Sequence, residues 1–188
     1  MSWTSHSRTG VAAILAGSLI FAGQGGELVF GSPSDFADVL FVGLGCAGFA
    51  ALVVAYWGLR EVIVGTRLGR LGMRLALVGV GLLGLFAVQV VVELIRTGDI
   101  PGNFILFALG FLLVLVGQLL FARDLRPTLG LGWLLPIVGV VGLVAALVGG
   151  ESPIHDVGLF VFEAALIALG VAVLRAEQRP AATAPALG

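Results

Sequence analysis

The chain has 188 residues, of which 59% are hydrophobic and only 11% are charged, and its mean hydropathy is +1.14. Soluble domains carry about a quarter charged residues and somewhat under half apolar ones, so this composition excludes most soluble proteins and favours a chain that lies in a lipid bilayer. The formal net charge of −1 and the scattered basic residues exclude a nucleic-acid partner, which would need a clustered basic surface.

Six stretches of the chain are long and apolar enough, or nearly so, to cross a hydrocarbon core about 30 Å thick, which takes roughly 20 residues of helix. The fold class that we expect is therefore all-α: a polytopic membrane protein with six transmembrane helices. In chain order the expected helices are Val11 to Phe30, Phe36 to Leu59, Leu71 to Ile95, Phe104 to Phe121, Leu131 to Val148 and Val157 to Leu174.

The expected organisation is one transmembrane domain, residues 10–178, between two cytoplasmic ends. Residues 1–9 precede the domain, and residues 179–188, which are rich in Ala and Pro, form a tail that we expect to be disordered. Helix-breaking residues occupy the connections, for example Pro33, Pro101, Pro127 and Pro153.

The arginines predict the orientation, because arginine in short loops favours the cytoplasmic side. All ten basic residues are arginine, and with the N-terminus inside only Arg96 falls on the outer side. We therefore expect a multi-pass protein of the plasma membrane with both termini in the cytoplasm. Tyr56, Trp57 and Trp133 fall at the inner boundaries, where aromatic side chains often anchor helices in the interface.

An internal repeat is suggested by matching polar positions. Phe21-Ala22-x-Gln24 with Glu27 resembles Phe86-Ala87-x-Gln89 with Glu93, and the fifth stretch also leads to an acid, Glu151. The second, fourth and sixth stretches each end in arginine. The predicted unit is an up-and-down helical hairpin repeated three times, at about 10–62, 70–127 and 130–178, although similar composition alone also makes apolar helices look alike. A true repeat argues that the first stretch is retained and is not a cleaved signal peptide.

Small residues recur at helical spacing and predict close helix packing, which drives association in lipid. One such face runs along the second expected helix, and we take it as a packing surface inside the chain or between chains. The expected partners are the bilayer itself and either further copies of this chain or another membrane protein. The residues of this face are Gly43, Ala47, Ala51 and Ala55.

Glu163 is the strongest candidate for a functional residue, because an ionisable group at the bilayer centre costs roughly 2.5–3.5 kcal/mol on insertion scales. It falls about six residues into the sixth expected helix. One interpretation is a cation or proton site. The other is a neutral acid that makes an interhelical hydrogen bond, to Gln89 or Gln24.

Two further groups of polar residues belong to the candidate pathway. Glu27, Glu93 and Glu151 would form an acidic ring at the outer mouth if the three hairpins surround an axis, and such rings select cations; otherwise each faces solvent separately at a helix end. Gln24, Gln89 and Gln118 are expected to bridge helices by hydrogen bonds.

No motif for catalysis, nucleotide binding or a cofactor occurs in the sequence, so we expect no enzyme. Glu151, His155 and Asp156 are a weak metal combination, since a single histidine without cysteine makes a poor zinc site. Two functions remain: a channel or transporter-like protein for a small solute or cation, and a non-catalytic accessory or structural subunit that acts through helix packing with partner proteins or lipids.

Overall fold

The computed structural model describes residues 4–30, 35–62, 65–98, 105–149 and 152–178, and of residues 26–39 it describes no side chain. These ranges are helical throughout, apart from a few residues at helix ends. The predicted disordered tail and the predicted turns around Pro33 and Pro101 lie outside them. The helices are α1 (Ser5–Phe30), α2 (Asp35–Val62), α3 (Arg67–Thr97), α4 (Ile105–Ala122), α5 (Arg126–Leu129), α6 (Leu135–Gly149) and α7 (Pro153–Gln178), with 3-10 turns at Arg123–Leu125 and Gly130–Leu134.

Four helical stretches of the described chain are long and apolar enough to cross a membrane. They lie in α2, α3, α7 and the run of helices from α4 to α6, and their bounds are Leu40–Val62, Arg67–Thr97, Pro153–Gln178 and Ile105–Gly149. Many large apolar side chains point outward from the bundle, Leu85 and Ile95 among them. The fold is therefore an all-helical bundle with the surface that a lipid-embedded protein presents.

The ends of α3 show why this helix is longer than the sequence pattern predicts. It begins four residues before Leu71 because Thr66 caps it, with its hydroxyl accepting a hydrogen bond from the Gly69 N–H over 3.1 Å. Its last residue is Thr97, and Gly98 caps it with a left-handed φ of 76° and an N–H that bonds to the Leu94 carbonyl. Hydropathy alone does not predict where a helix begins or ends, because caps depend on single residues and their local hydrogen bonds.

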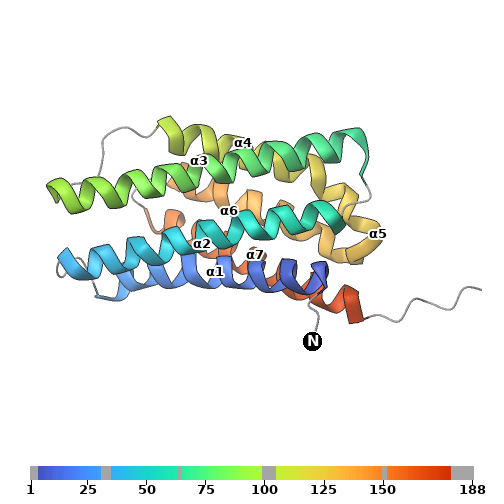
Figure 1. The fold of residues 1–188 in the computed structure, drawn as a ribbon, viewed down its shortest axis with the longest axis horizontal. Helices are drawn as coiled ribbons and strands as arrows, with labels where there is room; N and C mark the ends of the chain where they lie inside the picture. Colours follow the sequence, from blue (N-terminus) through green and yellow to red (C-terminus); the bar gives the residue numbers. More distant parts are fainter. Residues whose placement is uncertain (1–3, 31–34, 63–64, 99–104, 150–151, 179–188) are drawn as a thin grey trace, which may run out of the picture.

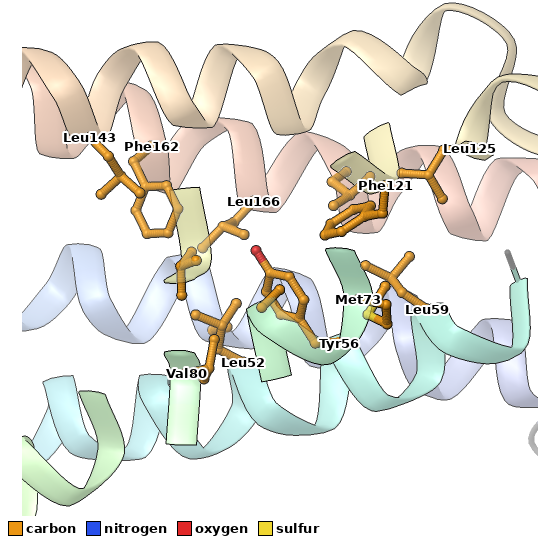
Figure 2. Close-up of a cluster of buried hydrophobic side chains, with 14 of the residues drawn as sticks. Leu52, Tyr56, Leu59, Met73, Val80, Phe121, Leu125, Leu143, Phe162 and Leu166 are labelled. Carbon is orange, nitrogen blue, oxygen red and sulfur yellow. The ribbon is translucent and has the colours of Figure 1, made fainter. Parts of the chain in front are cut away.

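Consecutive helices run antiparallel along the bundle, and they pack mainly in the pairs α1 with α2, α3 with α4, and α6 with α7 (Figure 1). Helix α1 also packs extensively on α7, so the first and last helices are neighbours. The helices surround a core to which α2, α3, α4, α6 and α7 all contribute (Figure 2). Leu52, Val80, Phe121, Leu143 and Leu166 are among its buried residues.

Glycines allow two of these helices to touch through their backbones. A Cβ atom added to Gly72 would lie 2.7 Å from the Gly117 carbonyl oxygen, and one added to Gly79 would lie 2.5 Å from that of Gly110. Gly72 and Gly79 are seven residues apart on α3, and Gly110 and Gly117 are seven residues apart on α4. Seven residues are close to two helical turns, so the two glycines of each helix lie on one face. The α3–α4 contact is thus fixed by four positions that accept no side chain.

Candidate functional site

Glu163 lies inside the bundle, ten residues after α7 begins, and is 0% exposed. At 1.5 Å per residue it is about 15 Å along the helix, which is deeper than the sequence pattern indicates because α7 begins at Pro153 rather than at Val157. Its backbone faces α1: a Cβ atom added to Gly17 would lie 2.8 Å from the Glu163 carbonyl oxygen.

The Glu163 carboxyl group makes no hydrogen bond with any described residue, through either oxygen. The interhelical bond to Gln24 or Gln89 is therefore not found in that part of the chain. A buried polar group without a partner is costly, by about 1–3 kcal/mol or more for a charged group. The described structure thus buries the Glu163 side chain inside the bundle, while its backbone carbonyl lies against Gly17 of α1.

Gln118 does bridge two helices. Its side chain is 2% exposed on α4, and its Nε2 donates a hydrogen bond to the Tyr56 hydroxyl on α2. Its Oε1 has no partner among the described residues and is directed toward Gly139 of α6. The pair joins sequence-distant helices at the centre of the core.

Tyr56 is not an interfacial anchor, contrary to the sequence prediction. It is 1% exposed, and Figure 2 shows its hydroxyl directed into the bundle, on the side of Leu166 and Phe121. Its ring meets that of Phe121 edge to face, with centroids 5.8 Å apart. Because Gln118 supplies a polar partner inside the core, the hydroxyl has no need of the membrane interface.

Gln24 lies beside two adjoining cavities, each of about 190 Å³, at the end of the bundle opposite the arginines. Its Oε1 is buried and unpartnered among the described residues. The cavities are otherwise mostly apolar, and Glu163 lines neither of them. Five residues line both: Ile20, Gln24, Phe49, Leu83 and Phe107.

The predicted acidic ring is only partly visible. Glu93 is half-buried near the end of α3, while the Glu27 side chain and all of Glu151 lie outside the described residues. Gln89 is half-buried one turn before Glu93. The acidic ring therefore stays a prediction.

The metal combination also includes Glu151 and is equally incomplete. His155 places its Nδ1 2.8 Å from the Ala146 carbonyl oxygen, so this nitrogen carries the proton and binds α6. Within the described ranges no three His, Cys, Asp or Glu side chains gather where they would hold a metal ion.

Sequence reasoning missed Asp124, a buried acid that is hydrogen-bonded in the described chain. It is 9% exposed, and its Oδ2 accepts hydrogen bonds from the N–H and the hydroxyl of Thr66, each over 2.8 Å. A Cβ atom at Gly69 would lie 1.9 Å from this oxygen, so the glycine makes room for the carboxylate. Asp124 lies between arginines in the sequence, and nothing in that setting indicates that its side chain caps α3.

The small-residue face of α2 turns from the outside of the bundle to its interior. Gly43 and Ala47 are exposed, Ala51 is half-buried, and Ala55 is 1% exposed. A Cβ atom added to Gly43 would meet no atom within 4 Å. Only the second half of this face is used for packing within the chain.

Comparisons of the chain with protein-family models, with curated proteins and with solved structures give no match. The function of the chain is therefore inferred from the geometry of the bundle.

Proposed function

We propose that this chain is a non-catalytic accessory or structural membrane protein that associates with further copies of itself through the exposed part of the α2 face. One observation carries this proposal: Gly72 and Gly79 of α3 meet backbone atoms of a neighbouring helix, whereas Gly43 and Ala47 of α2 face outward. Lipid supplies no hydrophobic drive between helices, so small residues on an outer face are the positions where a second helix can approach closely.

The proposed topology has six spans, with α4 and α6 crossing separately. Support comes from the reversal of chain direction between them (Figure 1). The contacts of α1 with both α2 and α7 support its retention in the mature protein. Arg60, Arg70, Arg126 and Arg175 lie toward one end of the bundle, which we call the arginine end, and we place it in the cytoplasm of a plasma-membrane protein.

The test is the number of copies per assembly in liposomes, measured by single-molecule photobleaching of a fluorescent fusion. Gly43→Leu is expected to shift assemblies to single copies, because its side chain would occupy the space a partner helix needs. Gly45→Leu is the matched control, since it also meets no atom within 4 Å but lines a cavity of the same chain. A wild-type protein that is monomeric at every density contradicts the proposal.

A second candidate function, carriage of a proton or cation, is favoured by the buried and unpartnered carboxyl group of Glu163. This candidate is the weaker one because Glu163 lines neither of the two cavities beside Gln24. Proton and cation flux into liposomes separates the two. If Glu163→Gln abolishes a flux that Glu61→Gln, at an exposed acid outside the candidate pathway, preserves, transport replaces helix packing as the function. If the wild type carries no flux, the second candidate is wrong.

A further inference from the structure

A cleft of about 270 Å³ opens at the arginine end, where α2 ends and α3 begins. It is lined by Arg60, Gly69, Arg70, Met73, Arg74 and Leu77. Three of these six residues are arginines with exposed side chains, and they come from two different helices. The cleft therefore combines a basic surface with a defined shape.

The chemistry of the cleft changes along its length. Residues 70, 74 and 77 of α3 share one helical face, because side chains three and four apart are neighbours. Leu77 follows Arg70 by seven residues, or about 10 Å along the axis toward the middle of the bundle. The cleft thus has a cationic mouth near the helix ends and an apolar wall, formed with Met73, further in.

The positive charge at the mouth is not neutralised by the described part of the chain. The side chains of Arg70 and Arg74 form no ion pair there, and that of Arg60 lies over the Trp57 ring, 5.4 Å from its centroid. Asp124 lies close to Gly69 and keeps its negative charge while its Oδ2 accepts two hydrogen bonds from Thr66, so it offsets only part of the charge of the three arginines. The start of α3 adds a further positive end of a helix dipole.

We propose that this cleft binds the phosphate of an anionic phospholipid from the bilayer that surrounds the protein. Guanidinium groups suit a phosphate because their N–H groups can form two parallel bonds to its oxygens. The apolar wall at Leu77 would then take the first part of an acyl chain. A free phosphate would use only the mouth, so the combination of charge and wall favours a lipid. This site goes beyond helix packing, and either proposal can fail without the other.

The experiment titrates the full-length protein in mild detergent with phosphatidylglycerol and, separately, with phosphatidylcholine, and counts bound lipids by native mass spectrometry. Each arginine near an anionic lipid contributes about 1 kcal/mol, so Arg70→Gln with Arg74→Gln is expected to weaken phosphatidylglycerol binding about 30-fold. The single variant Arg74→Gln is expected to weaken it about fivefold. Arg123→Gln with Arg126→Gln removes the same charge at the same end, outside the cleft, and is expected to change binding less than twofold.

Three results would overturn the lipid site. Equal loss in both double variants would mean that net charge alone attracts the lipid. Equal binding of phosphatidylcholine would mean that the arginines select nothing. Displacement of the lipid by millimolar inorganic phosphate would assign the cleft to a soluble anion. Thermal unfolding in lipid-free detergent verifies that the variants are folded, and the single variant decides the matter if the double variant is not.

Discussion

The two ends of the bundle are closed in different ways. At the arginine end, hydrogen bonds tie sequence-distant segments together: Asp124 holds the start of α3, and Glu177 on α7 accepts from Ser7 on α1 over 2.7 Å. Toward the opposite end, two mostly apolar cavities lie among α1, α2, α3 and α4, beside Gln24, whose Oε1 has no partner in the described part of the chain. There His155 on α7 donates to the Ala146 carbonyl on α6 over 2.8 Å. Among the described residues, the polar contacts of the arginine end join segments far apart in the chain. Toward the opposite end, the His155 bond joins two consecutive helices, and the surroundings of the cavities are mostly apolar.

The greatest loss of stability is expected where glycines bring α3 and α4 into close contact. Gly72→Leu would drive a side chain into the Gly117 carbonyl, and we expect a loss of about 3 kcal/mol or more in the free energy of unfolding, or no folded protein. Gly81→Leu, on the same helix with no atom within 4 Å, is expected to change it by less than about 0.5 kcal/mol. Unfolding in detergent, followed by circular dichroism, measures both. Equal effects would show that the α3–α4 contact is not close.

A smaller loss of stability is expected when the hydrogen bonds at the arginine end are removed. Asp124→Ala removes both hydrogen bonds to Thr66. Because the lost acceptor is charged, we expect the free energy of unfolding to fall by about 2 kcal/mol. We also expect faster hydrogen exchange at the start of α3. Exposed Arg123→Ala serves as the neighbouring control. If Thr66→Val and Asp124→Ala lower stability by strictly additive amounts, the two side chains do not interact.

A smaller loss is expected at the core bridge between α2 and α4. Tyr56→Phe removes the acceptor of the Gln118 amide, and hydrogen bonds between membrane helices contribute about 0.6 kcal/mol on average and at most about 1.7. We therefore expect a decrease of about 1 kcal/mol in the free energy of unfolding, with the ring packing on Phe121 retained. An unchanged stability in Tyr56→Phe, with Gln118→Leu also neutral, would contradict the bridge.

The last prediction is a small gain in stability, and it concerns the cavities beside Gln24. Gly45→Leu places a side chain in one of the two cavities, and filling a cavity typically adds about 0.5–2 kcal/mol. Gly84→Leu gains the same helix propensity without lining a cavity, so the difference between the two variants isolates the filling itself. Equal stability of the two variants would mean that the space at Gly45 is not enclosed.

Much of the fold follows from the sequence because apolar length is a strong signal in membranes. The hydropathy pattern predicted an all-helical chain, and the described residues confirm it. Helix ends were predicted less well, since Thr66 and Gly98 act through local hydrogen bonds and backbone conformation. The spacing of small residues by four indicated a packing face, whereas the close α3–α4 contacts use glycines seven residues apart.

The candidate site was harder to predict because polar partners come from distant parts of the chain. The position of Glu163 in a helix predicts burial, but nothing in the sequence says that its carboxyl group lacks a described partner. Tyr56 resembled an interfacial anchor until Gln118, 62 residues away, supplied its hydrogen bond. Asp124 and Thr66 are 58 residues apart and meet only through the antiparallel packing of α3 and α4.

The most direct test of the account is the accessibility of the two ends of the bundle in intact cells. In a Cys46→Ala background, single cysteines replace Arg126 at the arginine end and Ser152 at the opposite end, and a membrane-impermeant maleimide labels whichever side is exposed. We expect labelling at position 152 in intact cells, and labelling at position 126 only after permeabilisation, with the protein in the membrane fraction throughout. Labelling at position 126 in intact cells, or recovery of the protein in the soluble fraction without detergent, would contradict the account.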